Sequence, residues 1–203
     1  MLQKRQDIIE TALRLFELHG YRAVGIDRII AESGVAKMTM YKHFRSKDDL
    51  VVEVLRERDR RTRESLAAFV TRSKGARNRV QAIFQWLDRR LKCAEFNGCM
   101  FVNAVSEYGQ DSGEILRTAS EHKSSMQAYF AAILSEAVST EAEPLSRQLM
   151  MLIDGATVAT QVSGRSDSAM AAWEIFSKLL PKSDEATGKS APRRVPKPAA
   201  ARA

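Results

Sequence analysis

Residues that interrupt helices are scarce in the first 180 positions of this chain. The 203-residue sequence contains only 10 glycines and 5 prolines, and four of those prolines lie beyond residue 180. Proline breaks a helix interior and glycine weakens it, so the body of the chain is predicted to be all-helical. The two cysteines, Cys93 and Cys99, lie on either side of an Asn-Gly turn. Their spacing permits a disulfide without indicating one, and we interpret both as free buried thiols in a reducing compartment.

Long apolar runs are also missing. The longest apolar stretch, around Leu149 to Ile153, is interrupted by Asp154, and the first residues lack the apolar segment of a secretion signal. A helix needs about 20 apolar residues to cross a bilayer. We therefore expect no membrane span and a cytoplasmic location.

Patterns for catalysis and metal binding are absent from the sequence as well. It contains no G-x-S-x-G, G-x-x-x-x-G-K-[ST], G-x-G-x-x-G or H-E-x-x-H motif, and its three histidines, His19, His43 and His122, are far apart. Such motifs supply a nucleophile, a phosphate loop, a dinucleotide loop and a zinc pair. We expect no enzymatic activity, no metal site and no cofactor.

The positive charge is concentrated at the two ends of the chain. The formal net charge is +7, with 14 basic and 11 acidic residues in positions 1–65, 12 of each in 66–180, and 6 and 2 in 181–203. A basic N-terminal unit suits contact with phosphates, whereas the neutral middle does not.

The most informative pattern lies in residues 26–50, which predict two short helices joined by a glycine turn. Three isoleucines within residues 26–30 share one helix face, and Gly34 would end that helix in a left-handed conformation. A second short helix follows and packs Met40 and Phe44 on the isoleucines. This is the pattern of a helix-turn-helix, which places its second helix in the major groove of DNA.

The segment resembles the DNA-binding domain of the TetR family of one-component transcriptional regulators. The residues that carry the resemblance are Phe16, Gly20, Tyr21, Ile26, Ile29, Ser33, Gly34, Val35, Thr39, Tyr41, Phe44, Lys47 and Leu50. The chain departs from the family pattern at Gly25 and Ala36, where Ser or Thr usually caps each motif helix, and at Met38, where a small residue is common. Ala36 offers no side-chain acceptor to the helix that follows it, which costs about 1 kcal/mol.

The resemblance implies an all-α, TetR-like architecture of three DNA-binding helices followed by a bundle that senses a ligand and dimerises. Apolar periodicity predicts nine helices in total. Besides the two motif helices, they are 3–19, a fourth from Ser46 to about 71–74, then 76–94, 99–108, 113–138, 144–161 and 167–180. The predicted domains are 1–46 for DNA binding, 47–180 for sensing and dimerisation, and 181–203 as a disordered basic tail. That tail is either simply solvated or weakly attracted to DNA.

The candidates for DNA contact are polar or exposed residues in and around the motif. They are Arg22, Arg28, Lys37, Met38, Thr39, Tyr41, Lys42, His43 and Lys47. Tyr41 and Lys47 are assigned to phosphates, which fix the position of a protein on the duplex, although Tyr41 alternatively packs in the motif core. Thr39 and its neighbours are assigned to base edges in the groove. Arg22 and Arg28 are alternatively ordinary surface arginines.

Arginine is also dense at positions 56–63, next to the motif. Acidic residues are interleaved with these arginines at helical spacing, among them Glu53, Glu57 and Asp59. Oppositely charged residues three or four positions apart stabilise a helix surface. We interpret this segment as a solvated, ion-paired helix face and not as a nucleic-acid patch.

The sensing site is expected in the neutral middle of the chain. His122 interrupts the apolar stripe of residues 113–138, and it is either a core histidine bonded to a neighbour or a ligand contact. The candidates for lining one cavity are Trp86, Phe96, Phe101, Asn103, Tyr108, His122, Met126, Met150 and Asp154. Flexible methionines suit an adaptable site for a small apolar or amphipathic effector.

The last two predicted helices carry apolar residues on more than one side and therefore need cover on two fronts. Small residues at Gly155, Ala156 and Ala159 would let a second backbone approach closely. The pattern and the resemblance predict a homodimer through helices eight and nine, with Ala159 and Phe176 in the interface.

These features predict a dimeric repressor that binds a near-palindromic double-stranded DNA operator and releases it when the effector enters the bundle. The alternative is a ligand-independent DNA-binding protein, because apolar residues at helical spacing line a pocket and fill a core equally well.

Overall fold

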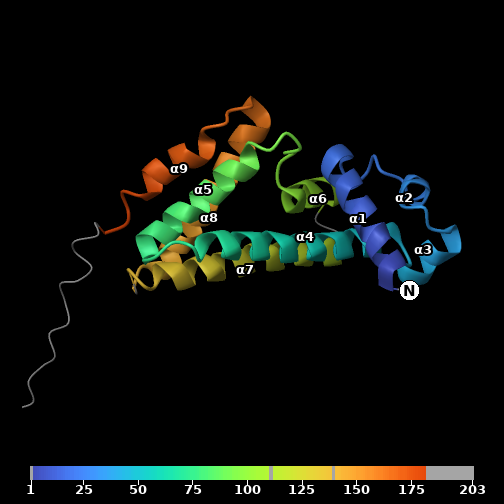
Figure 1. Cartoon of the computed structure of the whole chain (residues 1–203), viewed down its shortest axis with the longest axis horizontal. Coiled ribbons are helices and arrows are strands. Elements are labelled where there is room, and N and C mark those ends of the chain that lie inside the picture. Colours follow the sequence, from blue (N-terminus) through green and yellow to red (C-terminus); the bar gives the residue numbers. More distant parts are fainter. Residues whose placement is uncertain (1, 110–111, 139, 182–203) are drawn as a thin grey trace, which may run out of the picture.

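The computed structural model describes residues 2–109, 112–138 and 140–181 (Figure 1). Its regular elements are nine helices: α1 Leu2–His19, α2 Ile26–Ser33, α3 Lys37–His43, α4 Lys47–Val70, α5 Ala76–Leu91, α6 Met100–Tyr108, α7 Gly113–Leu134, α8 Ala142–Ser163 and α9 Ser168–Phe176. The predicted number and order of helices are confirmed for these residues. The predicted tail lies outside the described residues, except for Pro181.

Several helix boundaries differ from the sequence prediction; among them, α5 ends at Leu91 and not at 94, and α7 ends at Leu134 and not at 138. Helix α8 begins at Ala142, two residues before Pro144, because a missing N–H costs nothing in the first turn of a helix. Helix α9 ends at Phe176 and not at residue 180. The chain continues there in a tight turn, in which the Leu179 N–H donates to the carbonyl of Phe176 at 3.0 Å.

The helices of the reading motif are bounded by a glycine at the end of α2 and by a serine N-cap at the start of α4. Gly34 ends α2 with a φ of 68°, a left-handed conformation that a side chain would strain. Neither Gly25 nor Ala36 provides a side-chain hydrogen bond to the helix that follows it. Ser46 does cap α4, where its Oγ accepts from the Asp49 N–H at 3.0 Å.

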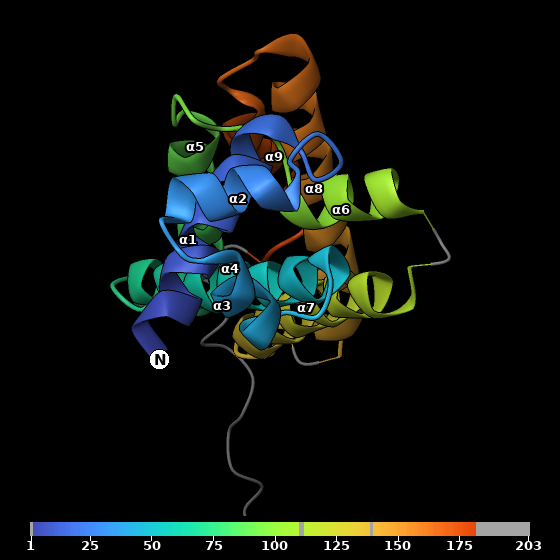
Figure 2. The same ribbon diagram turned by 90° about the vertical axis from the view of Figure 1, so that its right-hand side faces the viewer.

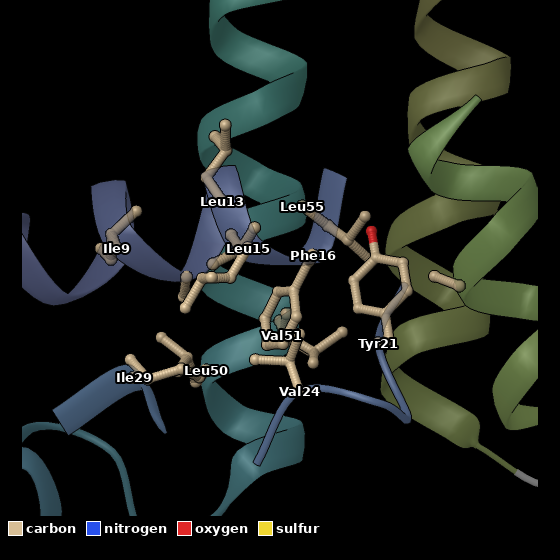
Figure 3. Packing of buried hydrophobic residues seen from close by; sticks show 14 of the residues in the cluster. Ile9, Leu13, Leu15, Phe16, Tyr21, Val24, Ile29, Leu50, Val51 and Leu55 are labelled. Atoms are coloured by element: carbon tan, nitrogen blue, oxygen red, sulfur yellow. The ribbon is translucent and has the colours of Figure 1, made fainter. Parts of the chain in front are cut away.

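A first hydrophobic cluster joins α1, α2, α3 and the first half of α4 to α6 and the start of α7. Figure 3 shows Leu15 and Phe16 of α1 packed against Val51 of α4, with Ile29 of α2 beside them. Tyr21 extends from the segment after α1 towards α6, where its hydroxyl donates to the carbonyl of Met100 at 3.0 Å. The core of the DNA-reading helices therefore continues into α6, beyond the boundary predicted at residue 46.

A second cluster joins the last part of α4 to α5, α8, α9 and the second half of α7. Figure 1 shows α4 and α7 running side by side along the length of the molecule, with the reading helices at one end and α5, α8 and α9 at the other. Figure 2 looks onto the reading end, where α2 and α3 face the viewer. Helix α4 thus belongs to both clusters and spans the distance between them.

Among the described residues, every helix is too short or too polar to serve as a membrane span.

Candidate DNA-reading surface and sensing cavity

Helix α3 separates its buried residues from its exposed ones. Met40 is 0% exposed and Phe44, directly after the helix, is nearly so, whereas Met38 is 82% exposed and Tyr41 45%. Lys37 and Lys42 are also exposed, and Thr39 and His43 are partly so. The predicted groove-facing residues therefore share an open surface, and Tyr41 does not pack in the motif core.

Several of the predicted cationic contacts already have protein partners. Lys37 Nζ lies 3.2 Å from Asp27 Oδ1, while Arg28 donates to Glu32 at 2.8 Å and to His19 Nε2 at 3.0 Å. Exposed ion pairs of this kind contribute little stability, so phosphate oxygens can replace these partners at small cost.

Glu107 of α6 fixes the backbone at the start of the motif. Its carboxylate accepts from the N–H groups of Tyr21 at 3.0 Å and Arg22 at 2.7 Å, and the Arg22 side chain donates to its carbonyl at 2.5 Å. Lys47 lies in the same neighbourhood, where partial burial lowers its pKa, opposed by Asp48 and Glu107. Arg22 thus ties the reading motif to α6, a role that its position in the sequence does not reveal.

Tyr108 belongs to this junction and not to the sensing cavity for which the sequence nominated it. Its ring packs edge-on against Tyr21 with centroids 6.2 Å apart, and the Arg22 guanidinium lies 5.6 Å from its ring centre. Burial raises the pKa of Tyr108 to about 12, with a further contribution from the charge of Asp48. Tyr108 lies on the last turn of α6, which faces the reading helices.

Six of the nine nominated sensing residues do meet around one cavity between α4, α5, α6, α7 and α8. They are Trp86, Phe101, His122, Met126, Met150 and Asp154. We call this space the sensing cavity; its volume is about 60 Å³. Phe96 and Asn103 are not in its lining: Phe96 packs at the edge of the second cluster, and the Asn103 side chain bonds the carbonyl of Asn97 at 3.0 Å.

His122 is held on two sides at the wall of the sensing cavity. Its Nδ1 lies 2.7 Å from Asp59 Oδ1 of α4, and its ring stacks on Phe101 with centroids 3.7 Å apart and planes 4° from parallel. Burial lowers the pKa of His122, and the hydrogen bond to Asp59 opposes that shift. His122 is thus bonded to a neighbour, as one alternative expected, and it also lines the cavity, as the other required.

Metal ligands do not gather in the part of the chain that the structure describes: no three His, Cys, Asp or Glu residues lie close enough to hold an ion.

The chain is similar to known transcriptional regulators both in sequence and in fold. Residues 8–54 match the family described as "Bacterial regulatory proteins, tetR family". The HTH-type transcriptional regulator LmrA of Bacillus subtilis is 33% identical over 92 residues, which are 45% of this chain and 49% of LmrA. The TetR-family transcriptional regulator SCO4454 of Streptomyces coelicolor has a solved structure that is 30% identical, with a TM-score of 0.81, over 89% of this chain and 97% of SCO4454. This chain belongs to the TetR family.

Membership makes the chain a helix-turn-helix transcriptional regulator and not an enzyme, as the sequence predicted. The reduced form of NemR from Escherichia coli has a TM-score of 0.80 at 17% identity, a likeness that concerns the fold alone. The chain spans about half the length of LmrA and about half or less of the other curated relatives.

The outer faces of α8 and α9 in this TetR-family chain carry exposed apolar residues. They are Met151, Val158 and Val162 of α8 and Ile175 of α9, with Leu179 in the turn after α9, and those of α8 flank the exposed small residues Gly155 and Ala159. The expectation that Phe176 lies in a dimer interface was wrong. Phe176 is 0% exposed within the single chain, and its ring lies 6.0 Å from that of Phe84 in the second cluster.

Sequence reasoning missed two residues of the site, Asp59 and Glu107, because their partners are distant in the chain. Asp59 bonds His122 across 63 positions, and Glu107 bonds Tyr21 across 86. The interpretation of residues 56–63 as an ion-paired face is confirmed for most of its arginines, for example by Arg60 with Glu57 and Glu64. Arg58, however, pairs with Glu17 of α1 through two hydrogen bonds of 2.6 and 3.2 Å.

Proposed function

We propose that this TetR-family regulator is a repressor that binds a near-palindromic operator as a homodimer and releases it when a small amphipathic molecule occupies the sensing cavity. The observation that carries the proposal is the direct bond between His122 in the cavity wall and Asp59 on α4. Helix α4 begins at Lys47, which is proposed to contact DNA, and it also carries Asp59. One helix therefore links the DNA-reading surface to the sensing cavity.

For the DNA side, we propose that α3 enters the major groove. Met38, Thr39 and Lys37 are then its base-edge and groove contacts, and Tyr41 and Lys47 bind phosphates on the flanking backbone. The separation of buried Met40 from exposed Met38 and Tyr41 supports this orientation. Lys42, His43, Arg28 and Arg22 are assigned to the periphery of the contact, the last through its position beside Lys47.

For assembly, we propose that α8 and α9 of two copies form a four-helix interface. The exposed stripe of Met151, Val158 and Val162 with Gly155 and Ala159 supports it, because side chains three, four and seven positions apart share a helix face. A two-fold axis through this face presents two α3 helices, and successive major grooves on one side of B-DNA lie about 34–36 Å apart.

For the response, we propose a shift between two arrangements of the dimer. A molecule in the sensing cavity displaces His122 and, through Asp59, the middle of α4. The reading helices then no longer match successive grooves, and operator affinity falls by the ratio of the ligand's affinities for the two arrangements.

A ligand-independent regulator is the second candidate, and the cavity size favours it. Sites for small molecules usually measure about 300–1,000 Å³, well above the 60 Å³ of the sensing cavity. An effector that lies wholly within this cavity must therefore enlarge it, and the flexible Met126 and Met150 in its wall allow this.

The test is native mass spectrometry of the purified protein together with gel shifts on its own upstream DNA. The proposal expects a dimer, a co-purified small molecule, and operator binding that the recovered molecule weakens. A dimer that binds the operator but is unaffected by any bound or added molecule would favour the ligand-independent candidate.

A further inference from the structure

A second hollow opens on the outer side of α4 and α5, next to the sensing cavity. We call it the arginine cleft, because Arg58, Arg61, Arg89 and Arg90 line it and no acidic residue does; its volume is about 430 Å³. Thr62, Trp86 and Arg90 line both spaces and form the wall between them. The cleft is within the usual size range of small-molecule sites, while the sensing cavity is not.

Arg90 stands in this wall without an anionic partner among the described residues. Its guanidinium lies 5.9 Å from the Trp86 ring centre, and the influences on its ionisation include no hydrogen bond. Although part of the residue reaches solvent, burial of the charged group lowers the pKa of Arg90; the nearby charge of Arg58 adds to this effect, and the charge of Glu17, which forms no ion pair with Arg90, partly opposes it. A desolvated cation that forms no ion pair is unfavourable. An anion that binds beside Arg90 therefore gains more binding free energy than it would on an open surface.

The other arginines of the cleft add hydrogen-bond donors, and Phe69 adds an aromatic surface beside them. Arg89 has no acidic partner among the described residues and lies 4.7 Å from the ring centre of Phe69. The Nε of Arg58 is buried without a hydrogen-bond partner. Guanidinium groups bind carboxylates through paired N–H donors, and the aromatic rings offer an apolar surface beside them.

We propose, on the basis of the proposed function, that the effector is an organic acid whose carboxylate binds Arg90 in the arginine cleft and whose apolar part lies against Trp86. Only a small apolar end of the molecule enters the sensing cavity beside His122, because that cavity measures about 60 Å³. The body of the molecule occupies the larger cleft.

This placement also gives the effector a second route to the reading helices. Arg58 and Arg61 line the cleft, yet their carboxylate partners include Glu17 and Glu10 of α1. A carboxylate that enters beside Arg90 competes with these two residues for the same guanidinium groups. Binding therefore weakens the contact between α1 and α4 at the end of the molecule that reads DNA.

The test compares acids with neutral molecules of the same shape. Phenylacetate is paired with phenylacetamide, and decanoate with decanol, in titrations of full-length protein followed by Trp86 fluorescence in a Trp173→Phe background. Because hydrogen bonds to charged groups are the stronger ones, the proposal expects at least one acid to bind about tenfold or more tightly than its neutral partner. Arg90→Gln should abolish that preference, Arg90→Lys should restore part of it, and exposed Arg72→Gln should leave it unchanged.

Two results would overturn the proposal: no acid preferred over its neutral partner, or a preference that survives Arg90→Gln in a folded protein. Thermal melts report folding, and Arg90→Gln removes an unpaired buried charge, so it should not destabilise the chain. The proposed function is judged separately by operator release. Operator release by a neutral compound, with no acid preferred, would leave effector control standing and refute only the assignment of an acid.

Discussion

The two ends of this regulator are built on different interiors. At the reading end, residues 2–55, the only described buried side chain with a polar atom is Tyr21, whose hydroxyl is bonded. In the remainder of the described chain, seven polar residues are buried: Thr62, Thr118, His122, Ser146, Thr157, Thr160 and Ser168. A closed apolar core resists local change, whereas a polar interior beside a cavity has alternative partners and space to rearrange. The difference supports the proposal that the reading end moves as a unit and that rearrangement begins around His122.

The largest expected effect is the loss of folding when a charge replaces a buried apolar residue of α9. The same change at an exposed neighbour should affect only assembly. Phe176→Glu should prevent stable folding, because it places an unpaired charge beside Phe84 in the second cluster. Ile175→Glu, on the exposed face of α9, should fold and yield a monomer. Circular dichroism and light scattering check both, with Val102→Glu on exposed α6 surface as a control that stays dimeric. An intact dimer for Ile175→Glu would remove α9 from the proposed interface.

The next largest effect is the loss of unfolding free energy when a large side chain is truncated, which should differ between the core of the reading end and the wall of the sensing cavity. Phe16→Ala should reduce the free energy of unfolding by about 3–5 kcal/mol, because it opens a void in the closed core where Phe16 packs on Tyr21. Met126→Ala should cost about 2 kcal/mol, near the lower end for such changes, because Met126 already borders a cavity. Urea denaturation monitors both variants. Equal losses would contradict the contrast between a closed and an adaptable interior.

A smaller effect is a dependence of stability on pH that arises from His122. Its folded-state pKa lies below the unfolded value of about 6.5, chiefly because of burial, with Lys123 and Arg90 contributing. As the pH falls through about 6.5, the unfolded chain gains a proton that the folded chain resists, so the free energy of unfolding decreases until the folded-state pKa is reached. His122→Gln keeps a donor for Asp59 without titrating. The difference between the two denaturation curves should therefore grow below pH 6.5, and a constant difference would argue against a buried neutral His122.

The smallest effects concern individual contacts at the reading surface. Lys47→Ala should weaken binding to all DNA sequences alike and reduce the slope of log affinity against log salt by about one. Met38→Ala should instead change which operator is preferred, because Met38 is exposed on the side of α3 that is proposed to enter the groove. Gel shifts at several salt concentrations measure both, with Lys74→Ala after α4 as the control. An unchanged salt slope for Lys47→Ala would show that the motif is placed wrongly on the duplex.

The sequence predicted the reading motif well, because the turn glycine and the apolar spacing that define the motif lie within a few residues of one another. Gly34 is required at the turn for its positive φ, and Met40 and Phe44 face the core as their spacing indicates. His122 was likewise visible as a break in an apolar stripe. The sequence does not show which element packs against such a residue, so Asp59 was assigned to the surface.

The errors have the same origin. Phe176 and Ile175 are neighbours on an apolar helix, and only the packing of α5 on α9 decides which of them faces inward. Tyr108 was nominated for the same cavity as Phe101, but it sits seven positions further along α6, at the end beside Arg22.

The most direct test of the central claim, that His122 and Asp59 transmit occupancy of the sensing cavity to the reading helices, is operator affinity measured with and without a molecule that releases the wild-type protein. His122→Phe and Asp59→Asn should both bind the operator with near wild-type affinity in the absence of that molecule, because neither residue belongs to the reading motif of α2 and α3. In its presence they should remain bound, while the exposed control Glu121→Gln is released like wild type. Release of His122→Phe and Asp59→Asn at the wild-type concentration of the molecule would contradict the account.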